Sequence, residues 1–67
     1  MLRLEFERRQ ARITQAALGR ETGVNPSTVS QIESGRVRAS VSELRRIADA
    51  LGYGDDPAKL SEEVSRP

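Results

Sequence analysis

The strongest constraint on the fold is a pair of short helix patterns in residues 14–35, each with its own start and stop signal. Thr14 is placed to cap the first helix, because its hydroxyl can accept a hydrogen bond from an unpaired backbone N–H in the first turn. Gly23 ends that helix, because glycine adopts the left-handed conformation just past a helix end without a side-chain clash. These signals predict a helix between Thr14 and Gly23.

A second helix is predicted to begin two residues after Gly23. Asn25 is a preferred cap, and Pro26 occupies the first helical position, where its missing N–H is no loss. Gly35 ends this helix as Gly23 ends the first. An apolar pair brackets each cap at the spacing of a hydrophobic staple: Ile13 with Leu18, and Val24 with Val29. A helix, a turn of about three residues and a second helix make a helix-turn-helix.

The second helix separates apolar from polar side chains. At about 100° per residue, Val29 and Ile32 point to one side. The opposite side carries small or neutral polar groups: Ser27, Ser30, Gln31 and Ser34. Such a face can approach a polyanion, and the Gln31 amide both donates and accepts, which suits a paired contact with adenine in the major groove. An ordinary solvent-exposed face is the alternative interpretation.

The two predicted helices and their turn resemble the Cro/CI-type helix-turn-helix family, also called the XRE family, of phage repressors and small bacterial regulators. The matching positions are Gln15, Leu18, Gly19, Gly23, Val24, Val29 and Ile32. The resemblance extends from about Leu4 to Leu51. Three positions depart from the family's pattern: Arg12 stands where glycine is usual, Ala39 where proline is frequent, and Pro26 where a base-reading side chain is frequent.

Candidate DNA contacts lie on both sides of the turn. We expect base contacts from four residues at the start and on the polar face of the helix over residues 26–34: Asn25, Ser27, Ser30 and Gln31. The resemblance implies phosphate contacts from Gln15 at the start of the first motif helix, and the loop after the second helix adds Arg36 and Arg38. Thr28, on the flank of the second helix, is a further candidate for a phosphate contact.

An ion pair is predicted between the first helix and the end of the second motif helix. Leu4 and Arg8 share one stripe of the first helix at i,i+4 spacing, which places a charge on an apolar face. Buried charges are seldom left unpaired. In related domains an arginine and a glutamate at the positions of Arg8 and Glu33 pair, so we expect that pair here. Two independent surface charges are the alternative.

The remaining segments complete an all-α fold. Ser40 and Glu43 form a capping box for a helix with a broad apolar face: Val41, Leu44, Ile47, Ala48 and Leu51. An Asp-Pro pair at residues 56–57 predicts a short last helix over about residues 57–64. The expected fold is a single five-helix, lambda-repressor-like helix-turn-helix domain over residues 1–67, with the motif at 14–35.

Two apolar residues of the predicted last helix, Leu60 and Val64, have little chain left to cover them. They could pack within the domain, against Phe6 and Leu2, or against the same patch of a second copy. Because one domain in one major groove buries little surface, we expect a homodimer on a pseudo-palindromic operator with half-sites about 34 Å apart. Such a dimer could be weak without DNA.

Composition excludes several classes of function. The chain of 67 residues has no cysteine and no histidine, which argues against disulfides, thiolate chemistry, histidine acid–base catalysis and the common zinc sites. We expect no enzyme activity, no metal and no cofactor. No apolar run approaches the roughly 20 residues of a membrane span, and residues 1–12 are too charged for a signal peptide, so we expect a cytoplasmic protein without a membrane partner.

Charge is distributed unevenly along the chain. The formal net charge is only +1, but residues 1–46 contain nine arginines and five glutamates, a net charge of +4, whereas residues 47–67 carry −3. The basic part is therefore the part that contains the motif, and arginine suits phosphate binding. A GC-rich genome is an equal explanation for the many arginines.

Together these features predict a small transcriptional regulator, with repression as the expected mode, that binds double-stranded DNA sequence-specifically. The helix over residues 26–34 would enter the major groove. An antitoxin-like protein-interaction module, with a partner protein bound on the same scaffold, is the alternative. A scaffold would tolerate acidic or bulky groups on the polar face, whereas Ser27, Ser30 and Gln31 are compatible with a groove.

Overall fold

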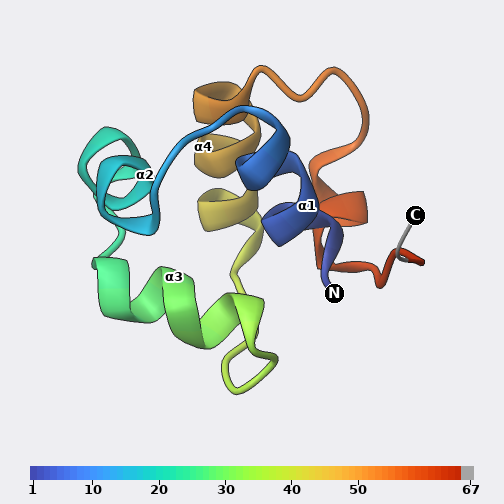
Figure 1. Ribbon diagram of the computed structural model, residues 1–67, viewed down its shortest axis with the longest axis horizontal. Helices are drawn as coiled ribbons and strands as arrows, with labels where there is room; N and C mark the ends of the chain where they lie inside the picture. The colour runs from blue at the N-terminus through green and yellow to red at the C-terminus, as the bar shows by residue number, and fades with distance from the viewer. Residues whose placement is uncertain (66–67) are drawn as a thin grey trace.

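The computed structural model describes residues 1–65 (Figure 1). Across these residues, helices are joined by loops and there is no strand. The elements are α1 (Arg3–Gln10), α2 (Gln15–Thr22), α3 (Pro26–Glu33), α4 (Val41–Leu51) and a 3₁₀ helix, η1 (Pro57–Ser61). An all-helical fold was expected from the sequence. No helix in this part of the chain is both long and apolar enough to cross a membrane.

The caps expected from the sequence are present at the helix starts. Thr14 Oγ1 accepts a hydrogen bond from the backbone N–H of Ala17 at 3.0 Å, and Ser40 and Glu43 form the reciprocal capping box. Gly23 ends α2 in the left-handed conformation, with φ of 75°. Local signals therefore set where α2 and α4 begin and where α2 ends.

The short last helix predicted over about residues 57–64 begins at Pro57 as expected, with Asp56 as its cap, but it is a 3₁₀ helix that ends at Ser61. After η1 the chain is extended and pairs with the N-terminus. The backbone N–H of Arg3 donates to the carbonyl of Glu62 at 2.7 Å, and the N–H of Val64 donates to the carbonyl of Met1 at 2.9 Å. A helix that reached Val64 would need its N–H for a bond to the carbonyl of Leu60, and that N–H is bonded to Met1 instead, so Val64 does not lie on a helix.

The core lies between α4 and the elements around it. Its largest fully buried side chains are Leu4, Leu18, Val29, Ile47 and Leu60. Leu60 is 0% exposed and Leu2 packs against the same core, so η1 packs onto the domain through Leu60. Leu60, which the sequence suggested as part of a contact with a second copy, is therefore already buried within its own domain. Val41, expected on the apolar face of α4, is instead 68% exposed at the first position of that helix.

The loop that enters α2 contains a strained residue. Arg12 has φ of 58°, in the left-handed region that costs an L-residue about 1 kcal/mol. The Cro/CI-type family, which the sequence resembles, usually has glycine at this position. The backbone needs a left-handed residue there to turn from α1 into α2, and arginine adopts it at that cost.

Helices α2 and α3 approach each other closely at Gly19. A Cβ atom at this position would lie 2.6 Å from the carbonyl oxygen of Val24 and 3.0 Å from Cγ of Pro26. Glycine in a helix costs about 1 kcal/mol relative to alanine. The absence of a side chain allows the turn to fold back onto α2, which explains why glycine occupies this position.

Gly19→Ala should therefore destabilise the domain, although alanine is the better helix former. Because the obstacle is a backbone atom, we expect the free energy of unfolding to fall by about 1–3 kcal/mol in chemical denaturation. Gly54→Ala is the matched control, since a Cβ at Gly54 meets nothing within 4 Å. Equal stability of the two variants would contradict the close approach of α2 and α3.

Candidate nucleic-acid interface

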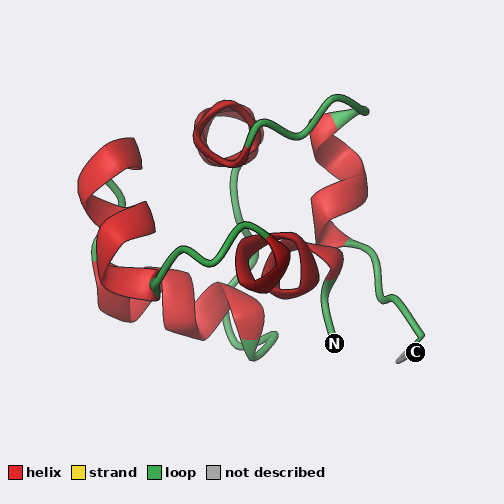
Figure 2. Ribbon diagram, turned by 45° about the horizontal axis from the view of Figure 1, so that its top comes forward, coloured by secondary structure: helices red, strands yellow, loops and turns green. Residues whose placement is uncertain are grey.

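Helix α3 runs along one edge of the domain, with α2 beside its N-terminal end (Figures 1 and 2). Val29 and Ile32 face the core and are buried, so the opposite side of α3 is left open to solvent. Asn25, Ser27, Ser30 and Gln31, the four candidates for base contacts, are all exposed. The structure therefore brings these four residues together on one accessible face.

The four candidates differ in which polar atoms are free. Asn25 Oδ1 accepts hydrogen bonds from the backbone N–H of Ser27 at 2.9 Å and from Ser27 Oγ at 2.7 Å. These two bonds occupy the side-chain oxygen of Asn25 and the hydroxyl proton of Ser27. Within residues 1–65, the Gln31 side chain forms no hydrogen bond with protein, so its donor and acceptor are both available for a base edge.

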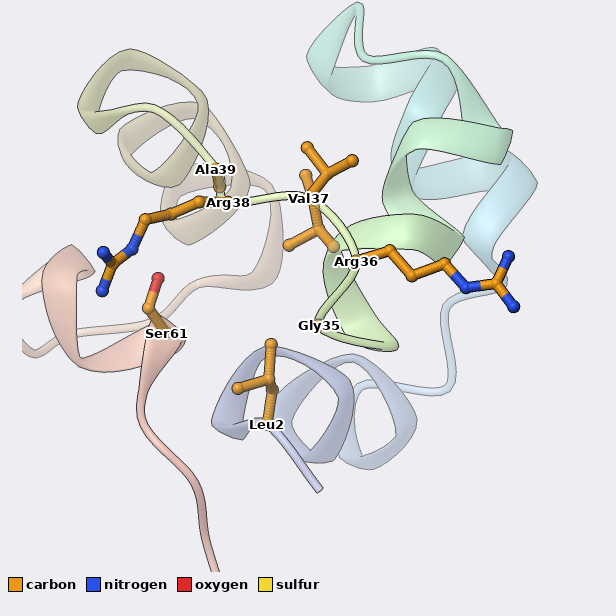
Figure 3. Close-up of a pocket in the computed structure, with 8 residues that line it drawn as sticks. Leu2, Gly35, Arg36, Val37, Arg38, Ala39 and Ser61 are labelled. Carbon is orange, nitrogen blue, oxygen red and sulfur yellow. The ribbon is translucent and has the colours of Figure 1, made fainter.

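The candidates for phosphate contacts lie around this face rather than on it. Thr28 is half-buried on α3, whereas Arg36 and Arg38 are exposed in the loop that follows. Figure 3 shows these two arginines pointing in opposite directions, with Arg38 extending towards Ser61. They do not form a single clamp. Gln15 is half-buried at the start of α2, and its Nε2 donates to Glu33 Oε1 at 2.9 Å.

A groove of about 420 Å³ opens beside the loop after α3 (Figure 3). It is lined by the loop residues 35–39, by Ile32, and by Leu2 and Ser61, which lie across from the loop (Figure 3). Val37 is 41% exposed and is one of two large hydrophobic side chains in residues 1–65 that are exposed, with Val41. The lining of the groove is mixed, because Arg36, Arg38 and Ser61 stand beside Leu2, Val37 and Ala39.

Arg8 and Glu33 form a nearly buried, two-pronged ion pair. Arg8 Nε lies 2.6 Å from Glu33 Oε2, and Arg8 Nη2 lies 3.0 Å from Glu33 Oε1. The two side chains are 11% and 4% exposed. The hydrogen bond to Glu33 raises the pKa of Arg8, against the opposing effect of burial. Arg8 Nη1 also donates to the carbonyl of Ile13 at 2.9 Å, so one guanidinium joins α1, the loop before α2, and α3.

One stabilising contact of the motif was missed by sequence reasoning. Arg46 of α4 donates from Nη1 to the carbonyl of Thr22, the last residue of α2, at 2.9 Å. A cation at a helix C-terminus satisfies an unpaired carbonyl and interacts favourably with the helix dipole. The two residues are 24 positions apart, and no local pattern in the sequence connects them.

The geometry defines the class of protein as a helix-turn-helix domain, with α2, the turn at Gly23 and α3 as the motif. The sequence matches the helix-turn-helix domain family over residues 2–60. The chain belongs to this family, in agreement with its Cro/CI-type resemblance. No curated protein and no solved structure matches the chain.

Removing Arg8 should destabilise the fold strongly, because Glu33 would be left as a nearly buried, unpaired charge. We expect Arg8→Ala to lower the free energy of unfolding by about 3–5 kcal/mol, measured by urea denaturation. The double variant Arg8→Met/Glu33→Leu, which removes both charges, should regain most of that loss. If the loss in this double variant equals the sum of the losses in Arg8→Met and Glu33→Leu alone, the two charges act independently.

Proposed function

We propose that this protein binds double-stranded DNA sequence-specifically as a small transcriptional regulator, in the simplest case a repressor. The observation that carries the proposal is the exposed face of α3, where Gln31 keeps its donor and acceptor free beside two serines. A helix in the major groove reads bases with such groups. The proposal is one of binding, not of catalysis.

The electrostatics of α3 support this role. Its one carboxylate, Glu33, is 4% exposed and is neutralised by Arg8. No acidic group on α3 therefore faces solvent, and exposed arginines follow the helix in the loop. A polyanion could approach this face without meeting like charge. A surface built to bind a partner protein would not need this pattern.

Gln31→Ala should weaken binding to the preferred site. A duplex selected from a random pool supplies that site, and fluorescence anisotropy measures affinity for it and for unrelated DNA. Loss of a paired contact to a base should cost about 1–3 kcal/mol on the preferred duplex and relax discrimination at one position per half-site. Gln10→Ala, an exposed glutamine of α1, is the control. Equal losses on both duplexes would make Gln31 a backbone contact.

Arg38→Ala should weaken all duplexes alike. If Arg38 neutralises one phosphate, the slope of log affinity against log salt should become shallower by about one. Arg45→Ala removes the same charge from an exposed site on α4, outside the loop, and should change the slope less. A wild-type affinity independent of salt would contradict phosphate binding altogether. Failure to select any preferred duplex would leave the antitoxin-like interaction module as the remaining hypothesis.

We further propose that two copies bind a pseudo-palindromic operator. The domain measures 29 × 25 × 22 Å, so one copy covers at most one of two half-sites about 34 Å apart. With Leu60 buried, Val37 is the exposed large hydrophobic side chain nearest the C-terminal end of α3 among residues 1–65, and it lines the groove together with polar residues. The small size of this surface indicates a weak dimer that is completed on DNA.

Sedimentation of the protein with its preferred duplex tests this arrangement. The wild type should bind as two copies per duplex, and Val37→Asp should shift the complex towards one copy, because a carboxylate would replace the apolar side chain expected to pack against the second copy. Val41→Asp is the matched control, since Val41 is exposed but does not line this groove. A wild-type protein that binds its full site as a monomer would refute the dimer.

A further inference from the structure

Gln15 and Glu33 meet where α2 begins and α3 ends. Gln15 Nε2 donates to Glu33 Oε1 at 2.9 Å. An ionised carboxylate only accepts hydrogen bonds, so the nitrogen of the Gln15 amide, and not its oxygen, must face Glu33. The contact therefore determines which way round the carboxamide lies and leaves its second N–H pointing away from the carboxylate.

We infer that Glu33 is a positioning residue for DNA binding, which holds the Gln15 carboxamide so that its second N–H is presented to a backbone phosphate. The inference rests on the proposed function. It assigns to the ion pair a role in DNA affinity beyond its role in stability. The contact to DNA is made by Gln15, and Glu33 acts through it.

The carboxylate is itself held rigidly. Arg8 binds both of its oxygens, at 2.6 Å and 3.0 Å, and the Glu33 side chain is almost fully buried. Glu33 Oε1 thus accepts from Arg8 and Gln15 together. A glutamine on the surface samples many rotamers, and ordering one on binding costs about 0.5–1.5 kcal/mol. Holding Gln15 in advance removes part of that cost.

The backbone that leads to Gln15 is held by the same arginine. Arg8 Nη1 donates to the carbonyl of Ile13, two residues before Gln15, at 2.9 Å. Both the start of α2 and the side chain of its first residue are therefore positioned relative to the end of α3. This arrangement fixes where the proposed phosphate contact on α2 lies relative to the proposed base contacts on α3.

The negative charge of Glu33 makes the inference testable, because two explanations predict opposite changes in DNA affinity when that charge is removed. Removing a negative charge near a polyanion should strengthen binding if only electrostatics matters. If Glu33 positions Gln15, Glu33→Gln should weaken binding, because the new amide offers one acceptor oxygen where the carboxylate offers two. Whichever way the amide lies, its NH₂ group takes the place of one carboxylate oxygen and faces a donor, either Arg8 Nε or the pair Arg8 Nη2 and Gln15 Nε2, so it cannot hold both partners as the carboxylate does.

A double-mutant cycle measures this coupling. Affinity for the preferred duplex is determined by fluorescence anisotropy for the wild type, Gln15→Ala, Glu33→Gln and the double variant, each well below its unfolding temperature. We expect Glu33→Gln to bind about three- to tenfold more weakly than the wild type, and to add little further loss in the Gln15→Ala background. Glu21→Gln, which removes an exposed carboxylate from α2, should bind no more weakly than the wild type.

Two results would overturn the inference while leaving the proposed function intact. One is a Glu33→Gln variant that binds DNA as well as, or better than, the wild type. The other is an equal loss from Glu33→Gln with and without Gln15. A wild-type protein that binds no duplex with sequence preference would instead overturn the proposed function and this inference together.

The free protein provides an independent readout. The chain has three glutamines, and the side-chain amide of Gln15 should differ in its NMR proton shifts from those of exposed Gln10 and Gln31. If Glu33→Gln does not fold, Glu33→Asp keeps the charge but shortens the reach, and it should shift the Gln15 amide and weaken binding similarly. A Gln15 amide indistinguishable from the other two in the wild type would overturn the inference.

Discussion

The buried ion pair between Arg8 and Glu33 is the interaction on which the geometry of the motif depends. It connects α1 to the end of α3 and, through the carbonyl of Ile13, to the loop that enters α2. Removing two charges from water costs several kcal/mol per ion, which good geometry and further hydrogen bonds must offset. Here each partner has more than one hydrogen bond, and no buried side-chain polar atom in residues 1–65 lacks a partner.

The position of α3 at the edge of the domain follows from how its neighbours are held. Val29 and Ile32 bury its inner side, and the missing side chain at Gly19 lets the turn lie directly against α2. Arg46 joins α4 to the end of α2 at Thr22. The motif is thus held from α1 and from α4, and the outer face of α3 takes no part in the core. That freedom permits the face to carry neutral polar groups suited to recognition.

The two ends of the domain are joined to each other. Leu2 and Glu63 form an isolated bridge, and the backbone bonds beside it hold the chain extended after η1. Leu60 is thereby directed into the core instead of onto the surface. The apolar side chain left for an outside contact near α3 is Val37, in the groove beside the loop (Figure 3).

The sequence by itself determined the local elements, because capping, staple and stop signals act over about five residues or fewer. Thr14, Asn25 and Gly23 placed the motif, and the polar face of α3 followed from its period. The tertiary structure alone decided the orientation of Gln15, which depends on a residue 18 positions away, and the contact of Arg46 with Thr22. It also decided that residues 62–64 pair with the N-terminus rather than extend a helix, since competition for backbone hydrogen bonds by a distant segment leaves no local pattern.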